Sequence, residues 1–556
     1  EGDIKMTWGD ETFDRSAELV LGVEVFLKPY AGVGIANVTG VGVQGSGTLG
    51  TKIVLLSNKE PLGIDEFTLD ASLGLKAYIG PFEYEKTFAQ KKWYLYSREN
   101  AASYADETEE EVLSVYDSSQ YSLSEQVYEA VFKENAPVYN AAASNTIISD
   151  IYMSAEPEIV SCGNDKVMVF LSTDNTRTAV NRTVLMYSVY DGDTKSWSMP
   201  VQVDNNKTMD LAPYLYELNG RIYLVYAQAD RVFADDISPD KAAVYFDITA
   251  AEFVDGKFVP TSITNGNGIY DSRPVITMIG GTPAVAWISN TESDFFGQNS
   301  SNALNYSKYV NGKWSTPVTI AKNINCVTDI SAGVLNGTAY ISVCTDGDND
   351  LLTEADKTIT MYTLDGTAVK IASGDVSAPK FTSLPNVNSD VIAWYEAGDI
   401  AYRTGVNGTT KYTFGYAAVS STYAVDGNNV MFTSADDSGN IGIYTISYIN
   451  RAWGTAIEAA EVTDSVTAYS AVDGMVVFVD THMDITDESL TDTSALKYCI
   501  YSEKYDIAVQ YADFDYETIA PGKDIDVTIG ITNKTQSTLT SVNIEISKPD
   551  GTKTTQ

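Results

Sequence analysis

Residues 275–317 read VITMIGGTPAVAWISNTESDFFGQNSSNALNYSKYVNGKWSTP. An extended apolar segment comes first and ends at the turn Gly280-Gly281. An apolar strand at Ala284–Ile288 follows, then a polar loop, a Tyr-rich strand and a last strand that opens at Trp314. Glycine pairs supply the positive φ angles that tight hairpin turns need. The stretch therefore predicts a small antiparallel sheet of about four strands.

The same order of segments returns about every 40–60 residues between Pro157 and Ser502. A repeat of this length with several strands per unit is typical of a β-propeller. The sequence therefore predicts an all-β fold with a seven-bladed propeller, although six or eight blades fit the same spacing. Seven second strands are expected, at Val167–Leu171, Ile222–Ala227, Ala284–Ile288, Ala339–Cys344, Val391–Tyr395, Val430–Thr433 and Met475–Val479.

The seventh repeat lacks an outer strand of its own. We expect a segment within residues 137–153, ahead of the first repeat, to supply it. A ring closed by both ends of the chain has no open sheet edge left to pair with other molecules.

The segment Val310-Asn-Gly-Lys-Trp314-Ser-Thr-Pro317 resembles bacterial propellers of the sialidase-like type. Many sialidases carry Asp boxes, S-x-D-x-G-x-x-W, and the stretch from Ser188 to Trp197 is a degenerate version. That family also needs an arginine triad, which the nine arginines of this chain do not supply in any motif. The resemblance implies the fold, and sialidase catalysis is not carried over.

Three further regions flank the ring. Residues 1–100 predict an antiparallel β-domain, and residues 101–136 an acidic linker with a short helix at Ser124–Asn135. Residues 137–504 form the predicted propeller. Residues 505–556 resemble the CARDB-like, immunoglobulin-type modules of bacterial adhesion proteins. The resemblance rests on strands at Tyr505–Val509, Asp526–Asn533 and Ser541–Ser547 and on the turn at Ile519–Lys523. Such a sandwich needs about seven strands, so this one is expected to be partial.

Charge narrows the classes of partner. Thirty-six basic and 75 acidic residues give a net charge of −39. Such a surface repels nucleic acid and anionic lipid and favours cations such as Ca²⁺. No apolar run approaches the ~20 residues of a membrane helix. The abundance of Thr, Ser, Asn, Gly and Tyr predicts an extracellular bacterial protein, on the cell surface or secreted.

Four cysteines occur without a CxxC pair, which makes a zinc site unexpected. Cys326 and Cys344 flank one predicted hairpin, and Cys162 and Cys499 lie in the first and last repeats. Disulfides within these pairs and four buried free thiols remain open alternatives.

Long acidic loops between the second and third strands are expected to share one face of the ring. One loop places Asp346, Asp348, Asp350 and Glu354 at positions 1, 3, 5 and 9. That spacing suits Ca²⁺, which takes six to eight oxygen ligands. The alternative is a solvated acidic loop. A second, less regular candidate comprises Asp480, Asp484, Asp487 and Glu488.

Loop aromatics are the candidate ligand-binding residues: Phe233, Phe295 and Phe296. Exposed rings bind sugars by stacking on their apolar faces, and the alternative is that these rings fold back onto the propeller. His482 is the only histidine, and no familiar catalytic motif stands in a credible setting.

These features predict a non-enzymatic extracellular surface protein for adhesion, which binds a glycan or a protein through the acidic loop face. Two alternatives remain. One is a carbohydrate-active enzyme of the glycosidase-like propeller type, with acidic residues as acid and base. The other is a structural subunit of a surface array or filament that associates with itself.

Overall fold

The computed structural model describes residues 144–501 except 153–154, 350–355, 385–388, 405–410, 414–417, 419, 428, 436–440, 450–451, 454–455, 464 and 486–489. Outside that span it describes residues 4–8, 15–20, 41–56, 63–79, 82–97, 118–123, 131–132, 507–514, 527–533, 545–547 and 553–555. Among these residues no helix is long and apolar enough to cross a membrane.

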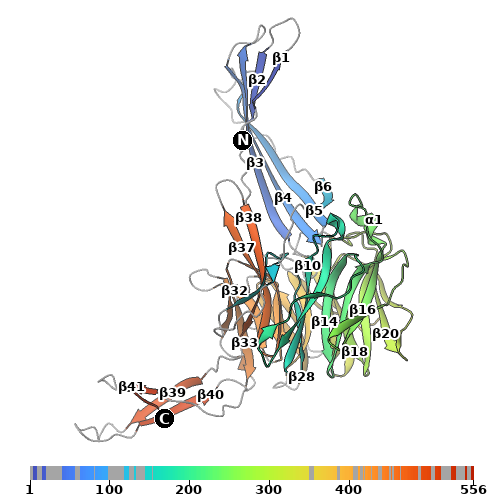
Figure 1. Cartoon of the computed structure of the whole chain (residues 1–556), viewed down its shortest axis with the longest axis vertical. Coiled ribbons are helices and arrows are strands. Elements are labelled where there is room, and N and C mark those ends of the chain that lie inside the picture. Colours follow the sequence, from blue (N-terminus) through green and yellow to red (C-terminus); the bar gives the residue numbers. More distant parts are fainter. Residues whose placement is uncertain are drawn as a thin grey trace, which may run out of the picture.

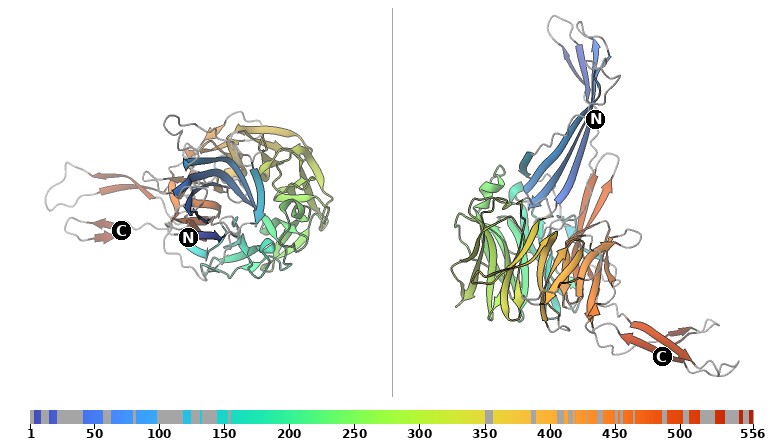
Figure 2. Two further views of the ribbon diagram at one scale, coloured as in Figure 1. Left: turned by 90° about the horizontal axis from the view of Figure 1, so that it is seen from above. Right: turned by 180° about the vertical axis from the view of Figure 1, so that it is seen from behind.

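The described residues form a seven-bladed propeller, seen as a ring in Figure 2. Blade 1 consists of β9 (Glu158–Cys162), β10 (Asp165–Thr173), β11 (Thr183–Asp191), β12 (Ser196–Trp197) and β13 (Val201–Gln202), with a short 3-10 helix at Ala179–Asn181. Blade 2 consists of β14 (Asp210–Leu218), β15 (Arg221–Ala229), β16 (Phe246–Val254) and β17 (Lys257–Ser262), with α1 (Pro239–Ala243) between β15 and β16. Blade 3 consists of β18 (Tyr270–Ile279), β19 (Thr282–Asn290), β20 (Asn302–Val310), β21 (Lys313–Trp314) and β22 (Val318–Ile324).

Blade 4 consists of β23 (Val327–Leu335), β24 (Thr338–Thr345), β25 (Lys357–Tyr362) and β26 (Ala368–Gly374). Blade 5 consists of β27 (Val376–Leu384), β28 (Ser389–Glu396), β29 (Asp399–Thr404) and β30 (Tyr412–Thr413). Blade 6 consists of β31 (Tyr423–Asp426), β32 (Asn429–Ala435), β33 (Ile441–Ile449), β34 (Ala452–Trp453) and β35 (Ile457–Glu461). Blade 7 consists of β36 (Ser465–Val472), β37 (Met475–Ile485), β38 (Leu490–Ile500), β8 (Asn145–Ser149) and β7 (Val131–Phe132).

The apolar second strands are buried because each blade packs between two others. Along β10 six consecutive residues are buried, and along β19 seven. A strand covered on both faces needs an unbroken apolar run rather than alternation. All seven predicted second strands fall within β10, β15, β19, β24, β28, β32 and β37, so the repeat interpretation is confirmed.

Hairpin turns have the backbone that their sequence demands. In the turn after β14, Asn219 has a φ of 51° and Gly220 a φ of 77°. Two consecutive residues with positive φ are the signature of the type I′ turn, whose twist matches that of the strands. The Asp-box-like segment is also a hairpin turn. There Asp191 Oδ1 accepts the N–H groups of Asp193 and Thr194. Its role in this chain is to shape the turn.

The ring is closed by strands from the two ends of the propeller segment, as predicted. The strand β8 pairs with β38, with Ile148 opposite Leu496. The helix expected at Ser124–Asn135 is wrong at Val131–Phe132, which form β7 and pair with β8. An exposed strand edge offers unpaired backbone groups, and a short strand satisfies them where a helix would not.

The N-terminal strands form one six-stranded meander, in the order β1 (Ile4–Trp8), β2 (Arg15–Val20), β3 (Val41–Leu56), β4 (Gly63–Ile79), β5 (Phe82–Ser97) and β6 (Ser118–Leu123). We call it the N-terminal sheet. It rises from one end of the ring, and the C-terminal strands lie beyond the other end (Figure 1). In that C-terminal region β39 (Ile507–Phe514) pairs with β40 (Val527–Asn533), and β41 (Glu545–Ser547) with β42 (Lys553–Thr555). The immunoglobulin-like module and the domain boundaries stay predictions.

The four cysteines are free thiols in this structure. Cys326, Cys344 and Cys499 are buried, while Cys162 is exposed. Of the two alternatives that the spacing left open, the structure therefore has free thiols rather than disulfides, although one of them is not buried.

Candidate functional site

The inner strands of the blades begin at the end of the ring that carries α1 and the N-terminal sheet, which we call the upper end (Figure 1). In blade 2, Asp210 at the start of β14 pairs with Gln228 at the end of β15. The loop that follows β15 contains α1. The first residues of the inner strands and the loops between second and third strands therefore lie at the same end.

In four blades the same backbone conformation occurs at or just before the start of the inner strand. A residue with positive φ is followed by proline in Glu156-Pro157 (φ 47°), Ala212-Pro213 (50°), Arg273-Pro274 (51°) and Ala378-Pro379 (49°). In blades 2, 3 and 5 the strand register shifts at this point. Such a bulge leaves two residues opposite one and re-aims a side chain, at the cost of backbone strain.

Charged side chains from the starts of inner strands, Asp329 at the start of β23 in blade 4 among them, form what we call the axial cluster: Glu156, Glu158, Arg273, Asp329 and Lys380. Glu156 is within electrostatic range of Glu158 and Arg273, and Glu158 is within range of Lys380. Asp329 is in turn within range of Arg273. These residues belong to blades 1, 3, 4 and 5, several of which are not neighbours in the ring. Only the convergence of inner strands around the central axis brings such blades together.

The two glutamates of blade 1 have raised pKa values. The pKa of Glu156 is raised to about 8, chiefly by burial and also by the negative charge of Glu158, while the charge of Arg273 acts in the opposite direction. The pKa of Glu158 is raised to about 7, because the effect of burial outweighs the lowering by Lys380 and by the hydroxyl of Ser470. Ser470 Oγ donates to Glu158 Oε2 over 3.3 Å. Near neutral pH the first carboxyl is protonated and the second is partly ionised, which is the division that acid–base catalysis uses.

Of the remaining members of the axial cluster, Arg273 and Asp329 are buried and Lys380 is half-buried. Arg273 is 8% exposed, and its Nη1 donates to the carbonyl oxygen of Thr328 over 2.6 Å. Asp329 is 1% exposed, and burial raises its pKa. Burial lowers the pKa of Lys380, although Glu158 and Asp329 act in the opposite direction.

Two carboxylate oxygens of the axial cluster are buried and lack a hydrogen-bond partner among the described residues, Glu156 Oε2 and Asp329 Oδ1. Buried polar atoms in proteins are nearly always satisfied, so such exceptions call for an explanation. A bound molecule that donates hydrogen bonds would satisfy both oxygens.

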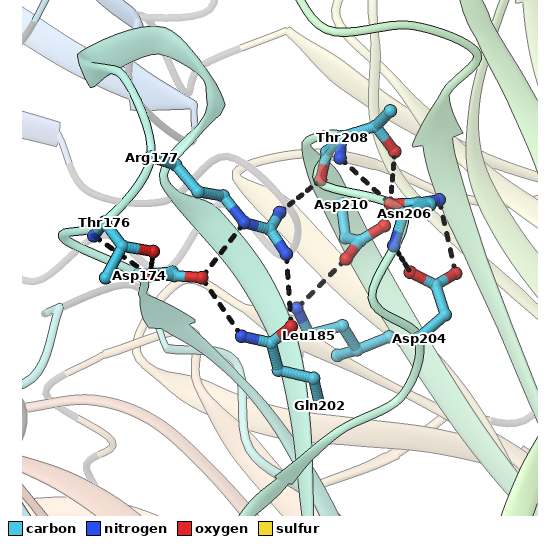
Figure 3. Close-up of polar contacts among 9 residues, drawn as sticks. All are labelled: Asp174, Thr176, Arg177, Leu185, Gln202, Asp204, Asn206, Thr208 and Asp210. Atoms are coloured by element: carbon cyan, nitrogen blue, oxygen red, sulfur yellow. Dashed lines mark hydrogen bonds and ion pairs between the residues drawn. The ribbon is translucent and has the colours of Figure 1, made fainter.

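A second polar network, drawn in Figure 3, joins blade 1 to blade 2. Arg177 pairs with Asp174 over 3.1 Å and donates to the carbonyl oxygen of Thr208 over 2.8 Å. Asp210 accepts the N–H of Leu185. Burial and the charge of Asp204 raise the pKa of Asp210 to about 7. Donors and acceptors satisfy one another here, so we interpret this network as a structural link between blades.

The predicted ligand-binding aromatics are buried: Phe233 is 5% exposed, Phe295 2% and Phe296 1%. The expectation of exposed rings is therefore wrong. Phe295 stacks on Tyr270, with 5.1 Å between ring centroids, and meets Phe82 edge-on at 5.1 Å. Phe82 belongs to the N-terminal sheet and is itself 1% exposed. These aromatic rings pack onto the propeller, which was the alternative to exposed sugar-binding rings. There they form an apolar cluster around Phe82 and so attach the N-terminal sheet to the ring.

The predicted calcium loop is described in part. Carboxylate oxygens of Asp346, Asp348 and Asp356 lie within 4.8 Å of one another and could hold a metal ion. Asp350 and Glu354 lie outside the described residues. Asp356 was missed because it follows the nine-residue spacing from which the loop was recognised. Calcium stays a prediction.

The second acidic loop and the single histidine contribute no described site. Asp480 is 3% exposed and accepts the N–H of Thr463 over 2.8 Å. It also forms an ion pair with Lys497. Asp487 and Glu488 lie outside the described residues. His482 is an exposed residue of β37.

Sequence reasoning missed the axial cluster. A signal was present, because the strand starts read Glu-Pro-Glu at 156–158, Ala-Pro-Tyr at 212–214, Arg-Pro-Val at 273–275 and Ala-Pro-Lys at 378–380. A proline that recurs at the first residues of a repeat marks a backbone irregularity. The charged residues beside it are then candidates for the centre of the ring.

No protein-family model matches the chain, and no curated protein sequence is similar to it. Several solved structures are. The polysaccharide lyase Uly1 is 12% identical, with a TM-score of 0.39 over 62% of this chain and 89% of that chain. A PL25 ulvan lyase bound to -[GlcA(1-4)Rha3S]- is 12% identical, with a TM-score of 0.37 over 66% and 96%. The α-L-arabinofuranosidase Arb93A from Fusarium graminearum is 10% identical, with a TM-score of 0.38 over 64% and 98%.

These similar structures contradict the expectation of a non-enzymatic protein, because they are lyases and a glycosidase. We correct that expectation. At TM-scores below 0.5 they say nothing about individual residues, so the chemistry of this chain has to be argued from its own contacts.

Proposed function

We propose that the protein is a carbohydrate-active enzyme of the glycosidase-like type, with its reacting centre at the axial cluster. One observation carries the proposal. At the positive-φ residue before the inner-strand proline, blades 2 and 5 have Ala212 and Ala378, whereas blades 1 and 3 have Glu156 and Arg273. This conformation therefore does not require a charge. Buried charges usually lower stability, so their presence favours a chemical role.

In this proposal Glu156 is the general acid and Glu158 the general base. Glu156 donates its proton to the glycosidic oxygen as the C–O bond breaks. Glu158 accepts a proton from the water that attacks the sugar carbon, and the product gains a new reducing end. Lys380 favours the ionised form of Glu158, which is the form that a base needs.

The glycan would reach the axial cluster from the upper end of the ring, beside the N-terminal sheet. We retain the predicted extracellular location and the glycan as partner. Recognition of a glycan, which the adhesion hypothesis also required, becomes the binding step of the reaction.

The test is a screen of the full chain against plant, algal and bacterial polysaccharides. New reducing ends report hydrolysis, and the ultraviolet absorbance of an unsaturated sugar reports elimination. On any glycan that is cleaved, Glu156→Gln and Glu158→Gln should each lower kcat/KM about 10²–10⁴-fold. Both replacements keep the size of the side chain and remove its acid–base function.

The matched control is Glu461→Gln, at an exposed carboxylate on β35, the outer strand of blade 6. It should leave kcat/KM unchanged. If the two axial variants cleave glycans as fast as the wild type, the axial cluster is not the reacting centre.

A further inference from the structure

We propose that the axial cluster recognises an anionic sugar, one that bears a carboxylate or a sulfate ester, through Arg273 and Lys380. This inference rests on the proposed function and names its substrate class. The shared chemistry is an oxyanion with two or more acceptor oxygens, on which the guanidinium and the ammonium would converge.

The two cations are not needed by the fold. At the bulge position of Arg273, blades 2 and 5 have alanine. At the position of Lys380, two residues further along the inner strand, blade 3 has Val275 and blade 2 has Tyr214. A chain with 36 basic against 75 acidic residues nevertheless places two of its cations at the axis.

The hydrogen-bonding capacity of Arg273 is mostly unused. A guanidinium has five N–H donors, and Arg273 uses one in its described bond to the carbonyl oxygen of Thr328. The remaining donors make no hydrogen bond with the described residues. The planar fork of arginine matches carboxylate and sulfate oxygens, with which it forms two parallel bonds.

Lys380 can contribute as a second charge. Its Nζ lies 5.3 Å from the ring centroid of Tyr423, a contact that orients the ammonium without using its three donors. Its carboxylate neighbours Glu158 and Asp329 both have raised pKa values, chiefly through burial. Glu158, with a pKa of about 7, is only partly ionised near neutral pH, so it competes weakly for the ammonium and leaves Lys380 able to meet a charge on the ligand.

The surface charge makes the inference testable. A net charge of −39 repels polyanions, so adventitious electrostatic binding of an acidic glycan is disfavoured. Binding of such a glycan would therefore report a local cationic site.

The experiment measures binding to the full-length Glu156→Gln variant, in which turnover is suppressed, by calorimetry at moderate salt. Two matched pairs of probes separate the two sources of charge: polygalacturonate with its methyl ester, and dextran sulfate with dextran. We expect at least one acidic probe to bind about tenfold or more tightly than its neutral partner. The pair that shows the difference identifies carboxylate or sulfate as the preferred group.

Arg273→Ala, added to that variant, should weaken binding of the acidic probe about tenfold or more, because charge-assisted hydrogen bonds are lost. Ala212 and Ala378 indicate that the bulge tolerates alanine, and circular dichroism verifies folding. The control is Arg221→Ala, at an arginine whose side chain is 57% exposed and paired with Glu252. It should leave binding unchanged.

Neutral probes that bind as tightly as acidic ones would overturn the inference, as would unchanged affinity in Arg273→Ala or no binding of either acidic probe. The proposed function fails differently. Acidic probes that bind but are never cleaved by the wild type support the anionic site and count against catalysis. Cleavage of neutral glycans alone supports catalysis and overturns the anionic site.

Discussion

Blades 1 and 3 differ from blades 2 and 5 at one position of a shared backbone. All four begin the inner strand with a positive-φ residue followed by proline, yet two of them carry Glu156 and Arg273 and two carry alanine. The positive-φ conformation is therefore independent of whether the residue is charged. The charge is an addition that only some blades make, and it is placed where the inner strands converge.

The comparison supplies controls within the molecule itself. An alanine introduced into blade 1 or 3 copies a conformation that blades 2 and 5 already adopt. A loss of activity in such a variant can then be separated from a loss of folding, which is often not the case for buried charges.

The largest expected effect comes from exchanging side chains between the two kinds of blade. Glu156→Ala should lower kcat/KM about 10²–10⁴-fold and leave unfolding free energy within about 1 kcal/mol of the wild type, or raise it. The reverse change, Ala212→Glu, buries a new carboxyl and should destabilise by about 3 kcal/mol. Denaturant unfolding and steady-state kinetics measure both. A strongly destabilised Glu156→Ala would mean that blade 1 needs its charge for folding.

Blades 2 and 3 also differ from blade 5 in the loops between their second and third strands. In blades 2 and 3, aromatic residues of these loops pack around Phe82 of the N-terminal sheet. Phe82→Ala should remove about 3–5 kcal/mol of local packing. Amide exchange should then accelerate about a hundredfold or more in the loop around Phe295 and stay unchanged in blade 5. If Phe82→Ala changes the amide exchange rates equally in the loop around Phe295 and in blade 5, this contact does not attach the sheet to the ring.

The pH dependence tests whether the glutamates of blade 1 act as a pair. Glu158 must lose its proton, with a pKa of about 7, and Glu156 must keep its proton, with a pKa of about 8. Activity should follow a bell with its maximum between these values. Glu156→Gln should abolish the alkaline limb of any residual activity.

The same shifts have a consequence for stability. Both pKa values are raised above the unfolded value, so the folded state binds more protons than the unfolded state at neutral pH. This contribution is complete below about pH 4.5 and is lost as pH rises through 7 and 8. The melting temperature of the wild type should therefore fall over this range more than that of the Glu156→Gln, Glu158→Gln variant.

The smallest effect is expected at blade 4. If Asp346, Asp348 and Asp356 hold Ca²⁺, millimolar calcium should stabilise the protein by about 1 kcal/mol, or a few degrees in melting temperature. Asp346→Asn should remove the effect, and Asp255→Asn at an exposed turn of blade 2 should not. Equal melting temperatures with calcium and with EDTA would contradict a calcium site and support the alternative, a solvated acidic loop.

The fold was more predictable than the site because its signals are local. Gly-Gly and Asn-Gly pairs, apolar second strands and the repeat length each act within one blade and predict hairpins without knowledge of the rest. The helix expected near Val131 was wrong because helical spacing was weighed without the free edge of β8, which lies next to it only in space.

The site depends on distances between blades. Phe295 looked like an exposed loop residue, and nothing near it in the sequence reveals Phe82, more than 200 residues earlier. Glu158 and Lys380 are likewise brought into electrostatic range by ring closure alone. Analysis of the sequence pattern within one repeat predicts neither the contact of Phe82 with Phe295 nor the proximity of Glu158 to Lys380.

The sequence by itself determined an all-β chain of repeated four-stranded units and the strand that closes the ring, because backbone pairing and turn geometry depend on neighbouring residues. It left the number of blades open, and the structure has seven. Tertiary structure alone decided which charges meet at the axis and which aromatics are covered. Burial and electrostatic interaction depend on separation in space, and a propeller joins at its centre residues that lie hundreds of positions apart in the chain.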